Sequence, residues 1–283
     1  MLAAAATALG SLAAVPAQAA THSGSVSVLS AGSLQTLMQD QIGPAFQKAT
    51  GYTLDNVSMG SKALASSITG GTLQGDVFIS ASPAVNASLE GGANGNWVSW
   101  YDQFASSPLV LGYNPSSKFA AALKTKPWYK VIAEPGFLIG RTDPTTDPKG
   151  VLSVSALDRA AAKHHLPQLK ALASQTGDVF PETSLVGELQ AGQLDAGFFY
   201  VVEAKTAHVP TVPLTPIYKY ADYTVTLLNN AENQSGGEAL VSFLLSPKRK
   251  AVEKEYGLVP IKPKFSGDAS AVPASLRSIV GAG

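Results

Sequence analysis

Four times along the chain, a strand-like apolar run is followed by a helical pattern whose first turn carries a hydroxyl or a carboxylate. The four residues are Ser33, Ser61, Asp147 and Glu182. The first N–H groups of a helix lack partners inside the helix, and the helix dipole adds partial positive charge at the same end. Several such helix starts facing one cleft would form a receptor for an oxyanion. The alternation of strands and helices predicts an α/β fold.

The composition is that of a globular chain large enough for two lobes. The chain has 283 residues, 45% of them apolar, and its 20 Lys and Arg residues balance its 20 Asp and Glu residues. A nucleic-acid-binding protein normally carries a basic excess, and the one short cationic run, residues 248–250, is typical of a solvated helix end. We therefore predict no nucleic-acid partner.

The N-terminal segment has the composition of an export signal. It is rich in Ala, Leu and Val and ends in Val15-Pro-Ala-Gln-Ala19, a small-x-small pattern that predicts a signal peptide, residues 1–19, cleaved after Ala19. The segment lacks the usual basic start, which is consistent with Met1 lying inside a longer leader. A flexible Ala-rich tail is the alternative interpretation.

The chain contains no cysteine, which excludes disulfides, thiolate metal sites, a Cys nucleophile and a lipid-modified Cys. Beyond the leader, no apolar run reaches the roughly 20 residues that span a bilayer. We therefore expect the mature protein to be free in a periplasm-like space and not embedded in a membrane. A monomer is the default expectation.

The first two helix starts follow short β-prone runs. Residues 26–29 precede Ser33 and residues 54–59 precede Ser61, and each serine is interpreted as the N-cap of the following helix. Ser is a preferred cap without any ligand, so a single case would favour a structural role. Two serines in matching positions favour a shared site.

The other two helix starts carry acids. Asp147-Pro148 places an Asp cap before a Pro at the first helical position, and Pro181-Glu182 is a similar arrangement. A strand predicted at residues 196–202 then carries Tyr200. Carboxylates in a first turn stabilise a helix by roughly 0.3–1 kcal/mol without a ligand, so the residues alone leave a structural role open for both acids.

The order of these patterns predicts two lobes connected twice. Lobe 1 would comprise residues 24–108 and the returning segment 210–283, and lobe 2 would comprise residues 109–209. Prolines in the second connection, near residues 207–216, suit a semi-rigid connector. Two connections of this kind form a hinge.

Several segments, taken in their order and spacing, carry a resemblance to one family. They are Ser30-Ala-Gly-Ser-Leu34, Gly60-Ser61, Gly75-Asp-Val-Phe-Ile-Ser80, Trp100-Tyr101 with Phe104, Leu109-Val-Leu-Gly-Tyr113, Pro127-Trp-Tyr129, Asp147-Pro-Lys-Gly150 and Leu189-Gln-Ala-Gly-Gln-Leu-Asp195 before Phe199-Tyr200. In these segments the chain resembles the periplasmic solute-binding proteins of molybdate and tungstate uptake systems, most closely their archaeal-type branch.

The resemblance implies a type II periplasmic-binding-protein fold, in which two α/β lobes close on a tetrahedral oxyanion. It implies that Ser33 and Ser61 are lobe 1 donors, that Tyr200 is a lobe 2 donor, and that the carboxylates of Asp147 and Glu182 reach the molybdenum or tungsten atom. The ligand would be molybdate or tungstate, no cofactor would be needed, and an inner-membrane ABC permease would be the partner. It implies no catalytic residue.

Three positions depart from that branch. Lys149 stands where the branch usually shows Cys, Val151 stands where it shows an aromatic residue, and Val201-Val202 follow Tyr200 where a basic or glycine residue and a serine are common. The lobe 2 side of the site is therefore expected to differ from that of the branch.

The expected selectivity has a chemical basis, and three alternatives remain open. A hexavalent metal centre accepts oxygen ligands beyond its four oxides, whereas sulfate cannot, and two ionised carboxylates would repel sulfate.

Sulfate or phosphate held only by N–H and hydroxyl donors is one alternative, and ferric iron held by Asp147, Glu182 and Tyr200 is another. An exported serine hydrolase is the third, although the four histidines lie in no triad or zinc motif.

Overall fold

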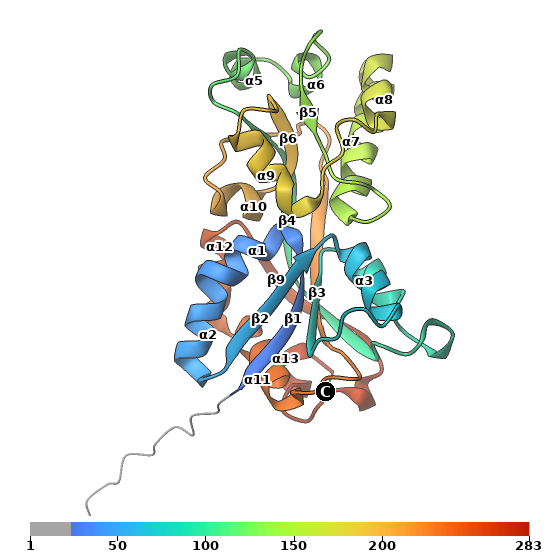
Figure 1. The fold of residues 1–283 in the computed structure, drawn as a ribbon, viewed down its shortest axis with the longest axis vertical. Helices are drawn as coiled ribbons and strands as arrows, with labels where there is room; N and C mark the ends of the chain where they lie inside the picture. Colours follow the sequence, from blue (N-terminus) through green and yellow to red (C-terminus); the bar gives the residue numbers. More distant parts are fainter. Residues whose placement is uncertain (1–23, 283) are drawn as a thin grey trace, which may run out of the picture.

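The computed structural model describes residues 24–282, so the predicted signal peptide lies outside the described residues. The described chain forms two α/β lobes, one above the other in Figure 1. The chain starts in the lower lobe (lobe 1), passes into the upper lobe (lobe 2) and returns to lobe 1. The predicted two-lobe α/β fold is confirmed.

The strands of the two lobes alternate with helices for most of the chain. The strands are β1 (Ser25–Ala31), β2 (Thr53–Met59), β3 (Val77–Ser80), β4 (Trp100–Tyr113), β5 (Ile139–Gly140), β6 (Ala196–Tyr200), β7 (Thr211–Pro213), β8 (Tyr220–Leu227) and β9 (Val259–Gly267). The α-helices are α1 (Gln35–Leu37), α2 (Gly43–Thr50), α3 (Ser61–Thr69), α4 (Pro83–Ala87), α5 (Ala120–Thr125), α6 (Trp128–Val131), α7 (Pro148–His164), α8 (Pro167–Ser174), α9 (Glu182–Gln190), α10 (Val201–Thr206), α11 (Gln234–Leu245), α12 (Pro247–Glu255) and α13 (Arg277–Val280). Short helical segments are η1 (Gly32–Leu34), η2 (Met38–Ile42), η3 (Gly92–Asn94) and η4 (Ala269–Ala271).

The sheet of lobe 1 has the order β2-β1-β3-β8-β4, and β9 also pairs with β4. β1 runs parallel to β2 and β3, as connections through helices require, and β8 returns antiparallel to β3. Successive side chains of a strand point to opposite faces. Val28 accordingly packs in the core beneath α2 and α11, while Leu29 packs with Leu64 of α3. Both faces of the sheet are therefore covered by helices.

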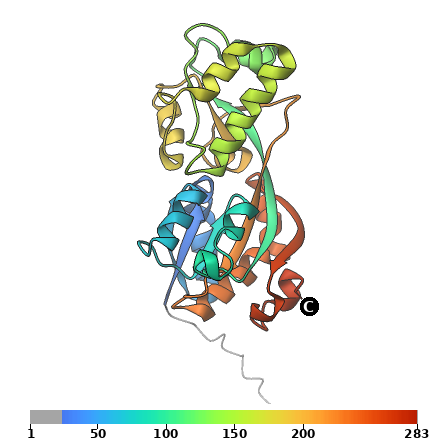
Figure 2. The same ribbon diagram turned by 90° about the vertical axis from the view of Figure 1, so that its right-hand side faces the viewer.

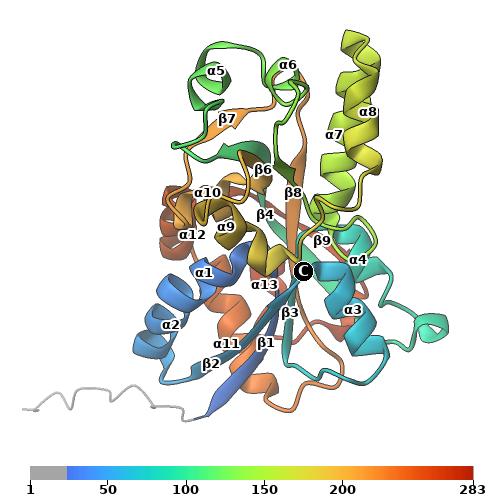
Figure 3. The ribbon, with the colours of Figure 1, turned by 45° about the horizontal axis from the view of Figure 1, so that its top comes forward.

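Lobe 2 is built on the upper half of β4. This half pairs with β6 and β7, and β6 pairs in parallel with the short β5. Val110 and Phe199 pack with Leu185 of α9 on one face, and Phe198 packs with Ala156 and Leu157 of α7 in the core on the other. The two faces thus hold α7 and α9, whose first residues point toward lobe 1, as Figure 3 shows.

The two lobes are joined along one side of the molecule. β4 continues from the lower sheet into the upper one, and the chain returns through the segment after β7, where the N–H of Leu109 donates to the carbonyl of Lys219 at 2.8 Å. Figure 2 shows the two connections, green and orange, next to each other. The lobe limits that we placed at residues 108/109 and 209/210 stay a prediction.

A buried serine lies at this junction. Ser107 Oγ donates to the carbonyl of Gly257 and accepts from the N–H of Val202, both at 3.1 Å. One hydroxyl therefore ties the returning C-terminal segment to the start of α10 in lobe 2.

Strand register brings the first two helix starts together. β1 and β2 pair so that Ala31 lies opposite Met59, the last residue of each strand. Each strand is followed by a glycine and then a serine, so η1 and α3 begin side by side at the carboxyl edge of the parallel strands. This edge is where ligands bind in open α/β sheets, and it faces lobe 2.

Candidate functional site

Ser33 lies inside the short helical segment η1, not at its N-cap. The N-cap is Ala31, which has extended backbone torsions, and no side chain caps this helix. The Ser33 hydroxyl instead lies 2.9 Å from the hydroxyl of Tyr223 on β8, and both groups are buried. The N-cap prediction is wrong for this residue because its side chain points back toward the sheet and not along η1.

Ser61 is the first residue of α3, and its N-cap is Gly60. The Ser61 hydroxyl accepts a hydrogen bond of 3.0 Å from the backbone N–H of Ala81, which follows β3. The N-cap prediction is wrong here as well. Both serines nevertheless lie buried at the edge of lobe 1 that faces lobe 2.

Asp147 is the N-cap of α7, as predicted. Its Oδ1 accepts a hydrogen bond of 2.9 Å from the N–H of Lys149, and Pro148 occupies the first helical position. The residue is only 2% exposed, and its Oδ2 has no hydrogen-bond partner. Half of this carboxylate is therefore used by the helix, and half remains for another partner.

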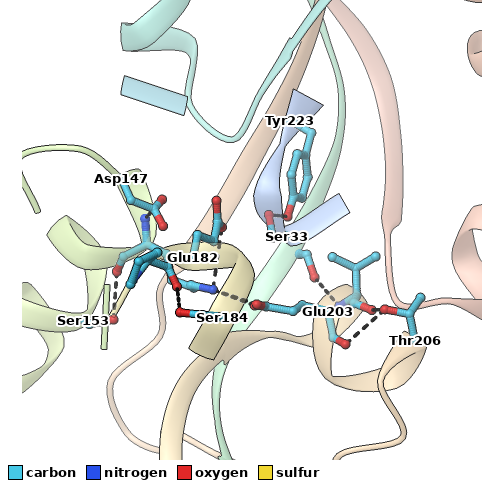
Figure 4. Close-up of polar contacts among 12 residues, drawn as sticks. Ser33, Asp147, Ser153, Glu182, Ser184, Glu203, Thr206 and Tyr223 are labelled. Atoms are coloured by element: carbon cyan, nitrogen blue, oxygen red, sulfur yellow. Dashed lines mark hydrogen bonds and ion pairs between the residues drawn. The ribbon is translucent and has the colours of Figure 1, made fainter. Parts of the chain in front are cut away.

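Glu182 is the first residue of α9, after the N-cap Pro181. It is 5% exposed, and neither of its carboxylate oxygens has a hydrogen-bond partner. The side chain lies against the backbone of Gly32 in lobe 1, where an added Cβ would come within 2.6 Å of Oε2. Glu182 thus reaches from lobe 2 to the start of η1. In the view of Figure 4 it lies between Asp147 and the Ser33–Tyr223 pair.

Tyr200 ends β6, since α10 begins at Val201, so the predicted strand to residue 202 was two residues too long. Its side chain is fully buried, and its hydroxyl has no hydrogen-bond partner. Its ring makes an edge contact with the ring of Tyr223 from lobe 1, with 6.1 Å between centroids. Tyr200 therefore belongs to the same contact between the lobes as the other four predicted residues.

Two charged residues of the site were not among the predicted ones. Lys149, in the first turn of α7, is 0% exposed, and its ammonium donates to Oε1 and Oε2 of Glu203 at 2.9 and 2.8 Å. Its Nζ also lies 3.6 Å from Oε1 of Glu182. The sequence held one signal for these two residues, namely that Lys149 stands where the archaeal-type branch usually shows Cys. A lysine placed near the acids Asp147 and Glu182 needs an acidic partner.

Burial governs the protonation of these groups. It raises the pKa of Glu182 well above the ordinary 4.5, and the negative charge of Asp147 raises it further. Burial also raises the pKa of Asp147 and of Glu203, in both cases against the attraction of Lys149. Burial alone would lower the pKa of Lys149, but the charges of Glu203, Glu182 and Asp147 outweigh it and hold that pKa above 10.5.

The hydroxyl groups of the two tyrosines are neutral for the same reason. Burial raises the pKa of both Tyr200 and Tyr223 well above 10, and nearby carboxylates raise it further. Each phenol therefore keeps its proton and can serve as a hydrogen-bond donor to an anion.

The lobes are in direct contact beside these residues. The N–H of Ala63, in the first turn of α3, donates to the carbonyl of Thr146 at 3.0 Å, and the Lys62 ammonium donates to the carbonyl of Pro144 at 2.8 Å. A Cβ on Gly60 would lie 2.6 Å from the Thr146 carbonyl oxygen. On the other side of the site from this α3 contact, α9 of lobe 2 lies next to α1 of lobe 1 (Figure 3). The structure is thus a closed form.

Among residues 24–282, two of the hollows lie between the lobes. A cavity of about 180 Å³ is lined by Ser33, Glu182 and Glu203 together with residues of α1 and α9. A larger groove of about 680 Å³ lies between α3, α4 and α7, but its lining is mostly apolar and includes none of the five predicted residues. The smaller cavity is therefore the one that reaches the candidate site.

Residues 26–259 match the family described as bacterial extracellular solute-binding protein. The chain belongs to this family. Its members are transport proteins and not enzymes, which overturns the hydrolase alternative. The site agrees, since Ser33 pairs with a phenol and Ser61 with a backbone N–H.

Individual relatives and structures are similar to this chain. An uncharacterized solute-binding protein of Halobacterium salinarum is 31% identical over 78% of this chain and 80% of its own length. The molybdate/tungstate-binding protein of Pyrococcus abyssi is 24% identical over 56% of this chain and 62% of its own length. The structure of the periplasmic molybdate-binding protein of Azotobacter vinelandii has a TM-score of 0.64 and 22% identity, and the match covers 84% of this chain and all of that one. That structure supports the fold.

Within residues 24–282, no helix is both long enough and apolar enough to cross a membrane.

Proposed function

We propose that this solute-binding protein captures molybdate or tungstate between its lobes and delivers it to the membrane permease of an ABC transporter. The proposed ligand-binding residues are Ser33, Ser61, Asp147, Glu182 and Tyr200. Asp147 and Glu182 would coordinate the metal atom of the oxyanion, and the hydroxyl groups would bind its oxygens.

The observation that carries this proposal is a group of buried oxygen atoms without hydrogen-bond partners at the contact between the lobes. They are Oδ2 of Asp147, both carboxylate oxygens of Glu182 and the hydroxyl of Tyr200. A buried polar group without a hydrogen bond costs about 1–3 kcal/mol, and more if charged. Four such atoms at one place favour a bound ligand that satisfies them.

The chemistry of these atoms favours an oxyanion of a high-valent metal. Molybdenum and tungsten centres are hard and take oxygen ligands beyond their four oxides, so the two carboxylates have a metal to bind. Sulfate has no such vacancy, and ionised carboxylates in a dehydrated site would repel it. The similarity to proteins named for molybdate or tungstate binding supports the same choice.

Delivery would follow from closure of the two lobes on the ligand. A ligand that binds both lobes stabilises the closed form of an open and closed equilibrium. Here Glu182 touches Gly32 and Thr146 accepts from Ala63, so the ligand site and the lobe contact share the same segments. A permease that recognises the closed form would receive loaded protein.

The experiment is a calorimetric and thermal-shift screen of residues 20–283 with molybdate, tungstate, sulfate, phosphate and ferric citrate. We expect strong binding of molybdate or tungstate and none of sulfate. X-ray absorption at the metal edge would then show coordination above four. Binding of sulfate or phosphate alone would refute metal coordination, and binding of iron alone would establish the cation alternative.

A further inference from the structure

Lys149 is held in the site by Glu203 and by two aromatic rings. Its side chain is fully buried, and two of its three ammonium hydrogens are used by the two oxygens of Glu203, at 2.9 and 2.8 Å. The rings of Phe199 and Tyr200 lie 5.5 and 5.9 Å from the Nζ atom. The position of the cation is therefore fixed by packing as well as by charge.

The third ammonium hydrogen has no such acceptor. The nearest remaining carboxylate oxygen is Oε1 of Glu182, 3.6 Å from Nζ, beyond the normal 2.7–3.2 Å of a hydrogen bond. This oxygen is itself one of the buried atoms without a hydrogen-bond partner. Lys149 therefore has one donor to spare on the side where Glu182 meets the cavity.

The cavity reaches this group of charges from the lobe 1 side. Ser33, Glu182 and Glu203 all contribute to its lining, and the Ser33 hydroxyl lies 2.9 Å from the hydroxyl of Tyr223 on β8. Figure 4 shows Glu182 and Glu203 on adjacent segments of lobe 2 near Ser33. Lys149 does not itself line the cavity, but its Nζ lies 3.6 Å from Oε1 of Glu182, so an anion bound against Glu182 would approach the ammonium.

We propose that Lys149 is a further ligand-binding residue, which donates its third hydrogen bond to an oxygen of the anion and selects a dianion over a monoanion of the same shape. Glu203 is the positioning residue that holds the ammonium in place. This inference rests on the proposed function and deepens it, because it names the source of charge selectivity in a site that otherwise offers neutral donors and carboxylates.

The competing interpretation is that Lys149 and Glu203 are only a structural ion pair. Replacing a buried ion pair by apolar residues of similar volume often leaves stability unchanged, whereas removing one partner is strongly destabilising. The decisive variant is therefore the double replacement Lys149→Met with Glu203→Leu, which removes both members of the hydrogen-bonded pair together. Its thermal unfolding without anion reports whether the fold is retained.

The test compares two tetrahedral oxyanions that differ in charge, molybdate (2−) and perrhenate (1−). Calorimetry of the wild type and of the double variant, by direct titration and by competition, gives both affinities. We expect molybdate to bind the double variant about 10- to 100-fold more weakly, the usual effect of losing a hydrogen bond between charged groups. Perrhenate should lose clearly less, so that the preference for the dianion falls.

Two results would overturn the inference. One is a folded double variant that binds molybdate as the wild type does, and the other is an equal loss for both anions, which a purely structural effect would produce. A wild type that binds neither molybdate nor tungstate refutes the proposed function instead, so the two failures are distinguishable.

A crystal structure of the wild type with tungstate tests the same contact without any variant, should the double variant not fold. We expect Nζ of Lys149 within about 3.2 Å of a tungstate oxygen. A tungstate with no oxygen within hydrogen-bond distance of Nζ would overturn the inference.

Discussion

The two lobes contribute opposite kinds of side chain to the candidate site. Lobe 1 offers the neutral hydroxyls of Ser33 and Ser61, and both already have partners within lobe 1. Lobe 2 offers the ionisable groups of Asp147, Glu182 and Lys149, and its two acids have oxygens without hydrogen-bond partners. The two serine hydroxyls of lobe 1 thus have hydrogen-bond partners without any ligand, whereas oxygens of the two acids Asp147 and Glu182 of lobe 2 do not.

The difference indicates that the two lobes have different roles in binding. Groups that are satisfied without a ligand define the shape of a site but gain little from binding, because binding exchanges one hydrogen bond for another. Buried charged groups that lack partners gain much, and their energy depends strongly on the charge of the ligand. We therefore expect lobe 2 to determine which anion binds.

The strongest test of this comparison is the double variant Asp147→Asn with Glu182→Gln, which keeps shape and removes both charges. It should weaken molybdate binding by about 100-fold or more, since each interaction of a charged group contributes about 1.5–3 kcal/mol. Calorimetry measures this loss, and Glu188→Gln on the same helix α9 is the matched control. A double variant with wild-type affinity would show that the acids of lobe 2 do not determine which anion binds.

The next test addresses the contact between the lobes through Gly60→Ala. The added Cβ would lie 2.6 Å from the Thr146 carbonyl oxygen and 3.0 Å from Asp147 Cβ, and backbone cannot easily yield. Overpacking typically costs 1–3 kcal/mol, so we expect about 10-fold weaker anion binding and a larger radius of gyration by X-ray scattering.

Gly92→Ala is the control for this variant, because a Cβ at Gly92 meets nothing within 4 Å. The φ of −53° at Gly60 is suitable for Ala, so the expected effect comes from the contact and not from backbone strain. Equal behaviour of the two variants would show that closure does not depend on this approach.

A smaller effect is expected from the lobe 1 hydroxyls. Ser33→Ala and Ser61→Ala each remove one neutral hydrogen bond, which contributes about 0.5–1.5 kcal/mol, so affinity should fall by about 2- to 10-fold. Tyr223→Phe distinguishes the loss of the Ser33–Tyr223 hydrogen bond from the loss of a direct contact between Ser33 and the ligand. This variant breaks the pair but leaves the serine hydroxyl free for the anion. If these serine variants lost more anion affinity than the variants of the lobe 2 acids, lobe 1 and not lobe 2 would determine which anion binds.

The smallest expected effect is on the pH dependence of stability. Burial and the charge of Asp147 raise the pKa of Glu182 in the folded protein above its ordinary 4.5. The folded state then binds more protons than the unfolded chain above pH 4.5, so the stability from this group is complete below that pH and is lost as pH rises through the folded pKa. Urea unfolding at several pH values without anion should show this decline.

The same measurement on Glu182→Gln should give a shallower decline, since the amide does not titrate. Asp147 and Glu203 also have raised pKa values and keep part of the slope. An unchanged slope would show that Glu182 is ionised in the folded protein over the whole range.

Much of the fold could be predicted because it depends on local patterns. Residues 54–59 were predicted to be β-prone, and they form β2, which begins one residue earlier. The Asp147-Pro148 pair marked the start of α7 correctly, because the side-chain cap and the fixed φ of proline are local effects. The first half of β4 could not be predicted from local patterns, since it pairs with β8 and β9, which lie far away in sequence.

The polar partners in the site could not be predicted in this way. The hydroxyl of Ser33 bonds to Tyr223, 190 residues away, and Lys149 bonds to Glu203, 54 residues away. A local pattern explains a serine at a helix start as a cap, but tertiary contacts outcompeted that role at both serines. The resemblance gave five positions that lie together, and only the structure shows how charge is arranged among them.

The continuity of β4 has a mechanical consequence. This strand of 14 residues belongs to both sheets, and its pairing shifts register between Gln103 and Ala105, just before it leaves lobe 1. Rotation of one lobe must therefore twist a hydrogen-bonded ribbon, because the lobes are not separated here by a slack linker. The junction should therefore resist rotation of the lobes more than a slack linker would, and the register shift is where the ribbon can twist most easily.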